Sequence, residues 1–252
     1  MIFEFNTIHK SKGDEADYVF ILHIKSGSMS FPSSVTDDKV LTLVKDDYYQ
    51  IENFTNIDTA DFTRFEGNSV SYAFKQNTLN RKQFSSSGSA FDFSVLYVSG
   101  RETSYPGSTS LLKDTISNKH NWLTFSSEFQ IFPIDEKLFH LGVHGKGVWS
   151  TQTLFANYTA SLLSSPSFDL IPDSKTFFLP EFRSPQFVGA GLNFIFSFNP
   201  KVDFRVDGYM YQPILMLSKV ENVSYQYAEP IQDAEFLTSA SLIFHSLVGP
   251  IR

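Results

Sequence analysis

The sequence predicts an all-β protein, and the alternation of residue types in its second half is the main reason. Between residues 188 and 198 apolar residues recur at every second position, with Gly, Asn and Ser between them. In residues 202–207, three apolar residues alternate with three charged ones, Asp203, Arg205 and Asp207. Successive side chains of a strand point to opposite faces, so each predicted strand has one face in an apolar medium and the other in a polar medium.

The composition supports this prediction. The 252 residues include 27 Phe, 11 Tyr and 2 Trp, which make 16% of the chain aromatic, while 19% is charged. Such a balance suits strands that face either a core or a lipid phase. No window approaches 18 consecutive apolar residues, which excludes a transmembrane helix but leaves a β-barrel open, because barrel strands carry only a short alternating signal.

Composition also excludes several kinds of chemistry. The chain has no cysteine, so a disulfide framework, a thiolate metal site and a cysteine nucleophile are ruled out. Its net charge of -7 argues against a nucleic-acid partner, because phosphate binding needs clustered Lys and Arg. The N-terminus lacks the basic-then-apolar pattern of a signal peptide, so an export signal would have to lie outside this chain. We expect no metal and no cofactor.

Residues 1–45 follow a different pattern from the rest. A short strand-like run, residues 2–8, leads into a polar loop containing Gly13, and a second apolar run follows at residues 18–24. Strand, polar loop and strand in this order predict a short α/β fragment. The alternative is an ordinary polar loop between two strands.

The loop Thr-Ile-His-Lys-Ser-Lys-Gly-Asp-Glu of residues 7–15 resembles a motif in the second motor domain of UvrD/Rep-type DNA helicases. The resemblance implies that Thr7, His9 and Lys12, with Gly13 in the loop, match DNA-facing positions. It implies that Glu15 matches a nucleotide-facing one. Asp14 departs from the motif, where an apolar residue is usual. No Gly-x-x-x-x-Gly-Lys-[Ser/Thr] phosphate loop occurs in the chain, so we expect this fragment to be inactive.

Residues 46–252 predict about seven antiparallel strands. They are residues 70–75, 91–97, 123–131, 139–143, 188–198, 202–206 and 236–248. Very short connections, residues 134–136 and 199–201, alternate with long ones, residues 101–121 and 151–186, the latter with a short helix near residues 154–163. Short turns at one end and long loops at the other are typical of an outer-membrane barrel, whereas a soluble sandwich has turns every 8 to 12 residues.

The same region resembles the C-terminal barrel of bacterial patatin-like phospholipases, which belongs to the surface-antigen class of outer-membrane barrels. The segments that carry the resemblance are residues 78–84, Ser87-Gly88, Tyr105-Pro106-Gly107, residues 187–211 and residues 239–250. It implies an antiparallel up-and-down transmembrane barrel in the outer membrane of a Gram-negative bacterium. Relatives continue for further strands, so the barrel here is expected to be open, with an edge that favours self-association.

We expect the polar side chains that could be reactive to have structural roles and not to form a catalytic or metal site. No Gly-x-Ser-x-Gly nucleophile elbow occurs, so no catalytic residue is expected. His140 and His144 share a strand face roughly 13 Å apart, too far to bind one metal ion. The side chains predicted to face a wet lumen are Glu128, His140, His144, Asp203, Arg205 and Asp207.

Asp203, Arg205 and Asp207 predict either a conducting pore or a static ladder of ion pairs with neighbouring strands, and we favour the ladder. Aromatic residues near strand ends would form the girdles at the two membrane interfaces. These are Tyr97, Trp149, Tyr209 and Tyr211.

The sequence therefore predicts a lipid-embedded barrel at residues 46–252, serving as a membrane anchor or translocator without the catalytic domain of a patatin-like protein. Two alternatives remain. One is a UvrD/Rep-derived fragment fused to a soluble β domain; the other is a soluble carbohydrate- or protein-binding β module.

Overall fold

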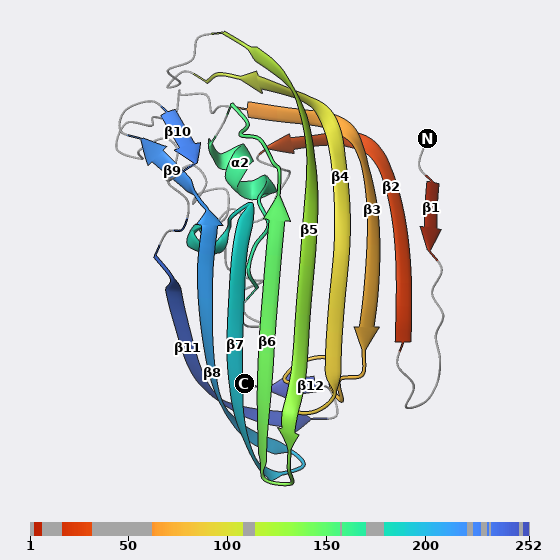
Figure 1. Ribbon diagram of the computed structural model, residues 1–252, viewed down its shortest axis with the longest axis vertical. Coiled ribbons are helices and arrows are strands. Elements are labelled where there is room, and N and C mark those ends of the chain that lie inside the picture. The colour runs from red at the N-terminus through yellow and green to blue at the C-terminus, as the bar shows by residue number, and fades with distance from the viewer. Residues whose placement is uncertain are drawn as a thin grey trace.

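The computed structural model shows one long, curved antiparallel sheet with small elements inside its curve (Figure 1). It describes residues 3–6, 17–31, 62–107, 114–156, 158–169, 179–220, 224–227, 231, 233–246 and 249–251. Within these residues no helix is both long and apolar enough to cross a membrane.

Ten strands form the sheet in the order β1-β2-β3-β4-β5-β6-β7-β8-β11-β12. Their bounds are β1 Phe3–Asn6, β2 Asp17–Phe31, β3 Phe62–Asn77, β4 Ser89–Tyr105, β5 Ile116–Asp135, β6 Phe139–Ser150, β7 Gln186–Asn199, β8 Val202–Leu215, β11 Glu235–Ser246 and β12 Gly249–Ile251. Each pairs antiparallel with its neighbours, so the chain runs up and down with hairpin connections. Among the described strands no hydrogen-bonded pairing joins the two edges, so the sheet is not closed into a barrel by hydrogen bonds.

Four smaller elements belong to the long connections. Helix α2, Tyr158–Ser164, and the 3-10 turn η3, Pro180–Phe182, lie between β6 and β7. The strands β9, Leu217–Val220, and β10, Ser224–Tyr227, pair with each other after β8. Figure 1 places α2, β9 and β10 at the upper end, whereas the β5–β6 and β7–β8 turns lie at the lower end. The expected short turns are therefore present at the lower end, but this end also carries the longer β3–β4 connection, residues 78–88.

The first two strands do not form the expected α/β fragment. β1 pairs antiparallel with β2, and β2 pairs with β3 along its full length, from Asp17↔Asn77 to Phe31↔Thr63. A parallel α/β unit needs a crossover of about a dozen residues or more, and only residues 7–16 separate β1 from β2. The expected domain boundary near residue 45 lies outside the described residues.

β4 and β5 are longer than the sequence pattern indicated. We expected a polar loop at residues 101–121, but β4 continues to Tyr105 and β5 begins at Ile116. The expected end of the strand at Gly100 is instead a bend, since three paired glycines, Gly27, Gly67 and Gly100, lie side by side across β2, β3 and β4. Figure 1 shows the upper parts of these strands bending over the top of the sheet.

The inner side of the curve holds two clusters of buried apolar side chains. The first joins Val148, Phe168, Phe182, Phe187 and Tyr211. The second joins Phe65, Val98, Trp122, Phe155 and Ala160. Both contain residues of the β6–β7 connection, so this connection folds into the curve and packs apolar side chains against the inner face.

Candidate functional site

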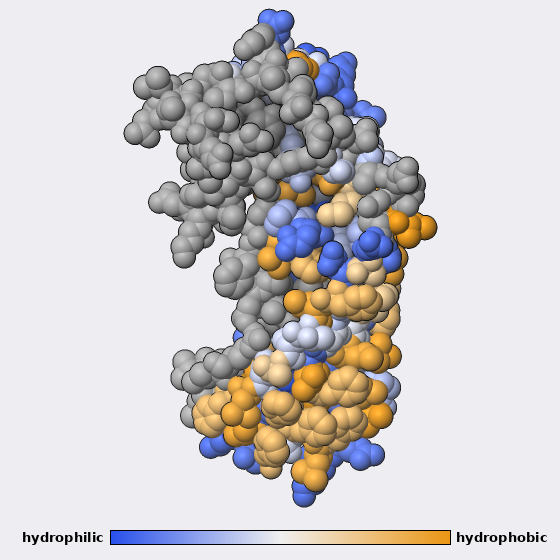
Figure 2. Space-filling view, turned by 90° about the vertical axis from the view of Figure 1, so that its left-hand side faces the viewer, coloured by the Kyte–Doolittle hydropathy of each residue, from blue (hydrophilic) through white to orange (hydrophobic). Residues whose placement is uncertain are grey.

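The two faces of the sheet differ in chemistry: the outer face is mainly apolar, whereas the inner face carries charged networks beside the two apolar clusters. On β8 the exposed fraction is 1% for Asp203 and 4% for Arg205, whereas Phe204 between them is 36% exposed. β7 repeats this arrangement, with Asn193 buried and Phe194 exposed. Figure 2 shows apolar side chains gathered over the lower part of the molecule, with hydrophilic ones at its lower end. A sheet in water has its apolar face covered and its polar face exposed, so along β7 and β8 the polarity is reversed.

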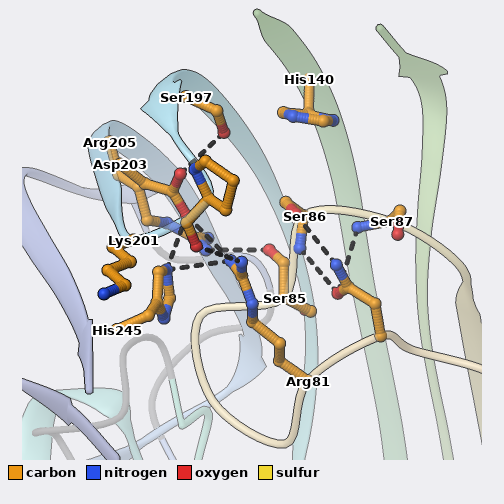
Figure 3. A network of polar contacts seen from close by, with 12 residues as sticks. Arg81, Ser85, Ser86, Ser87, His140, Ser197, Lys201, Asp203, Arg205 and His245 are labelled. Carbon is orange, nitrogen blue, oxygen red and sulfur yellow. Dashed lines mark hydrogen bonds and ion pairs between the residues drawn. The ribbon is translucent and has the colours of Figure 1, made fainter. Parts of the chain in front are cut away.

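Asp203 is the centre of the most extensive polar network on the inner face (Figure 3). Its Oδ1 accepts a hydrogen bond from Ser197 Oγ at 2.7 Å, and its Oδ2 accepts one from Arg81 Nη1 at 2.9 Å. His245 Nε2 lies 2.7 Å from the same Oδ2. The network joins β7, β8, β11 and the connection between β3 and β4. A buried carboxylate with this many donors is stably ionised and paired.

His245 Nε2 has two neighbours and can satisfy one at a time. It lies 2.9 Å from Arg81 Nη1 as well as 2.7 Å from Asp203. When Nε2 carries a proton it donates to the Asp203 carboxylate; when it does not, it accepts from Arg81. The tautomer of this ring therefore decides whether Asp203 accepts from Ser197 and Arg81 alone or from His245 as well.

Arg205 and Asp207 continue the network one layer further from the turn. Arg205 Nη2 lies 3.4 Å from Asp207 Oδ1, and its Nη1 donates to the Ser85 carbonyl at 2.9 Å. Asn193 Nδ2 donates to Asp207 Oδ1 at 2.7 Å. Of the expected pairs with neighbouring strands, Asp203 has one, with His245 on β11, whereas the two arginine pairs differ from the expectation. Asp203 pairs with a loop that crosses the inner space, and Arg205 pairs within its own strand.

Glu128 belongs to a row of charges that crosses four strands. Paired positions in this row are Lys75, Asp92, Glu128 and Lys146, from β3 to β6. Lys75 Nζ lies 2.8 Å from Asp92, and Lys146 Nζ lies 3.1 Å from Glu128. His144 Nε2 adds a contact to Glu128 at 3.2 Å. The two acidic side chains in the middle of the row, Asp92 and Glu128, are each paired with a lysine on the next strand.

The two histidines of β6 have different partners. His144 contacts Glu128, whereas His140 Nδ1 lies 2.7 Å from Asp135 Oδ1. In the part of the chain that the structure describes, no group of three or more His, Asp and Glu side chains could hold a metal ion.

A second buried network was not found by sequence analysis. Glu102 on β4 is fully buried, and its Oε2 lies 2.7 Å from His120 Nε2 on β5. His120 Nδ1 lies 2.7 Å from Thr153 Oγ1, and the Ala156 N–H donates to Glu102 Oε1 at 2.7 Å. The pair thereby ties residues 153–156 to the sheet. Continuing the two-residue period beyond Gly100 would have placed Glu102 on the inner face.

The β6–β7 connection has further polar anchors near the upper end. The Tyr227 hydroxyl of β10 donates to the Gln152 carbonyl, and burial raises the pKa of Tyr227 to about 12, which keeps the donor protonated. Arg183 donates to the carbonyls of Leu163 and Ser165. Burial lowers the pKa of the Arg183 guanidinium, an effect that the Asp169 carboxylate opposes.

The expected aromatic girdle is half wrong. Tyr97 and Trp149 are each 47% exposed on the outer face, as expected. Tyr209 and Tyr211 lie instead on the inner face, where Tyr211 is fully buried against Phe168 and Phe187. Both tyrosines follow Asp203, Arg205 and Asp207 at even spacing along β8, so the period of two places them with the charges.

The helicase-like positions Thr7, His9, Lys12, Gly13 and Glu15 lie outside the described residues. The six polar residues predicted to face a lumen all lie on the inner face, although Glu128 is only partly covered.

Comparison with known proteins adds no family to this arrangement. No protein-family model matches the chain, and no curated protein or solved structure is similar to it. What the geometry itself defines is a mostly β protein built on one antiparallel sheet.

Proposed function

We propose that the chain is a membrane-embedded barrel segment that acts as an anchor or translocator in a lipid bilayer. The observation that carries this proposal is the reversed polarity of the sheet. Among the described residues 23 large apolar side chains are exposed, more than the 14 apolar side chains that form the buried core. Soluble monomers rarely expose continuous apolar patches of this kind, whereas a lipid phase stabilises them.

The height of the outer apolar band supports a bilayer as the medium. On β4 the outward side chains are apolar from Phe91 to Tyr97 and become polar at Ser99 and Arg101. On β5 the outward positions from Leu123 to Ile131 are apolar except for Ser127, and the segment is nine residues long. A transmembrane strand tilted by about 45° needs about 9–11 residues to cross the hydrocarbon region, so a segment of this length is sufficient.

The aromatic residues of the outer face lie near the upper limit of this band. Tyr97 pairs with Leu123, and Trp149 pairs with Phe125, so the two aromatic side chains are at similar heights on β4 and β6. Tyr and Trp are enriched where the hydrocarbon region meets the headgroups. Their position favours an interface at the end of the molecule that carries the long connections.

The more specific role rests on the resemblance to the barrel of patatin-like phospholipases. We infer an outer-membrane anchor that lacks the catalytic domain of those proteins, in a Gram-negative bacterium. The up-and-down order of the strands and the short turns at one end support this role. The open edges of the sheet support self-association, because unpaired strand edges accept further strands.

The test is folding with and without lipid. The chain is purified from inclusion bodies, refolded into detergent micelles or lipid vesicles, and run unheated and heated on a denaturing gel beside a lipid-free sample. We expect a heat-modifiable band only with detergent or lipid. Soluble, cooperative folding in plain buffer would refute the proposal.

A matched pair of variants makes this test specific for the outer band. Leu192→Lys puts a charge on the outward face of β7 within the band, and Asn121→Lys puts the same charge on β5 above it. A lysine near the bilayer midplane costs about 2–4 kcal/mol, and one near the interface about 0–1 kcal/mol. We expect Leu192→Lys to reduce the folded fraction in vesicles and Asn121→Lys to leave it unchanged.

A further inference from the structure

The connection between β3 and β4, residues 78–88, folds into the curve of the sheet rather than away from it. Arg81 reaches Asp203 on β8, and the Ser85 carbonyl accepts from Arg205 on the same strand. The Phe84 ring lies 5.6 Å from the Arg205 guanidinium carbon. Because β8 lies five strands from β3 in the sheet order, these contacts span the inner space (Figure 3).

This loop has a defined internal structure. Asn80 Oδ1 accepts from the Ser86 N–H at 3.1 Å, and its Nδ2 donates to Ser86 Oγ at 3.0 Å. Gly88 has a φ of 89°, and a Cβ there would lie 2.2 Å from the Thr78 carbonyl oxygen. The side chains of Ser85 and Ser86 are buried. The segment is therefore an ordered part of the interior.

The length of the connection exceeds what a hairpin at this end needs. The β5–β6 connection has only residues 136–138, and the β7–β8 connection only residues 200–201. Residues 78–88 join an equally adjacent pair of strands. The additional residues are used for contacts across the inner space, not for joining β3 to β4.

Above the loop lies a polar layer that the protein does not fully satisfy. Asn193 Oδ1, Arg205 Nε and Ser239 Oγ are buried and have no hydrogen-bond partner among the described residues. Asn193 and Ser239 occupy positions paired with Asp207, on either side of β8. Buried polar atoms of this kind are normally satisfied by water, so this layer is a suitable environment for water.

We infer that residues 78–88 are a plug that closes the turn end of the inner space, between water outside and the polar layer at Asn193 and Ser239. The inference rests on the proposed membrane-spanning arrangement and extends it. Arg81 and Arg205 hold the plug through the two cross-space contacts to Asp203 and Ser85. Release of these contacts opens the polar layer to small water-soluble molecules from the turn end.

The absence of native cysteine allows a direct test. Ser239→Cys places a thiol in the polar layer, and it removes a hydroxyl that has no described partner. The variant is folded in lipid nanodiscs and treated with a sulfonated, membrane-impermeant maleimide. The labelling rate of Ser239→Cys is then compared in three chains: one with the native loop, one with residues 79–87 replaced by Asn-Gly, and one that also carries Arg81→Ala. We expect labelling to be slow with the native loop and at least tenfold faster without it.

The controls separate this inference from the proposed function. Ala190→Cys lies on the outward face of β7 and should resist the same reagent in nanodiscs. Rapid labelling there would refute the membrane arrangement. Two outcomes would refute the plug while leaving the membrane arrangement intact, provided that Ala190→Cys is protected. One is rapid labelling of Ser239→Cys with the native loop, and the other is an unchanged slow rate without the loop. Heat-modifiable migration shows which variants fold. If the variant with the shortened loop does not fold, Arg81→Ala replaces it in the comparison.

Discussion

His120 illustrates how burial decides what a single contact contributes. Its ring nitrogen lies 2.7 Å from Glu102, and His140 has an identical contact distance to Asp135. The two carboxylates differ: the side chain of Glu102 is 0% exposed, and that of Asp135 is 51% exposed. Removing one partner of a buried pair leaves a charge without compensation, whereas an exposed carboxylate is solvated by water.

We therefore predict that His120→Ala lowers the free energy of unfolding by about 3–5 kcal/mol. We expect the loss of the ion-pair contact in His140→Ala to cost no more than about 1 kcal/mol. Urea unfolding of both variants in the same detergent, followed by tryptophan fluorescence, measures the difference. Equal losses in the two variants would show that the burial of Glu102 does not determine the energy of its contact.

At the scale of the element, glycines decide where strands bend. At Gly100 a Cβ would lie 2.5 Å from the Glu66 carbonyl oxygen and 2.5 Å from the Phe65 ring, whereas at Gly147 nothing lies within 4 Å. We predict that Gly100→Ala destabilises by about 1–3 kcal/mol, because backbone must shift to relieve the overlap. Gly147→Ala should be neutral or slightly stabilising, since alanine restricts the unfolded chain. The urea midpoints of the two variants test this, and similar midpoints would contradict the role of the bend.

The strands and their connections also show what could and could not be predicted from the sequence. The period of two located the middle parts of β3 to β8 and β11, and the face of Asp203, Arg205 and Asp207, because alternation is a local property of each strand. It missed β9, β10 and the upper parts of β4 and β5. The position of residues 78–88 could not be predicted, since its contacts depend on how far the whole sheet curls. The pattern alone predicts a strand end at Gly100, because the row of Gly27, Gly67 and Gly100 is visible only once the strand register is known.

At the scale of the whole molecule, the reversed polarity links the fold to its medium. Outward positions of neighbouring strands form one apolar band, and inward positions hold the charged networks and the two apolar clusters. Charged side chains remain inside because each has a partner at hydrogen-bonding distance, as Asp203 does with Arg81 and Ser197. A lipid phase outside and paired charges inside together account for both faces.

The two tryptophans test this arrangement without any new probe. Trp149 is half-exposed on the outer face, and Trp122 is buried inside against Phe65 and Phe155. In vesicles of brominated phosphatidylcholine, bromine quenches indoles that contact acyl chains. We predict that Trp122→Phe, which retains only Trp149, loses most of its fluorescence relative to the same variant in unbrominated lipid. Trp149→Phe, which retains only Trp122, should keep its fluorescence, because the wall of the sheet separates that ring from lipid. Equal quenching of the two variants would contradict the assignment of inner and outer faces, and quenching of Trp122 alone would reverse it.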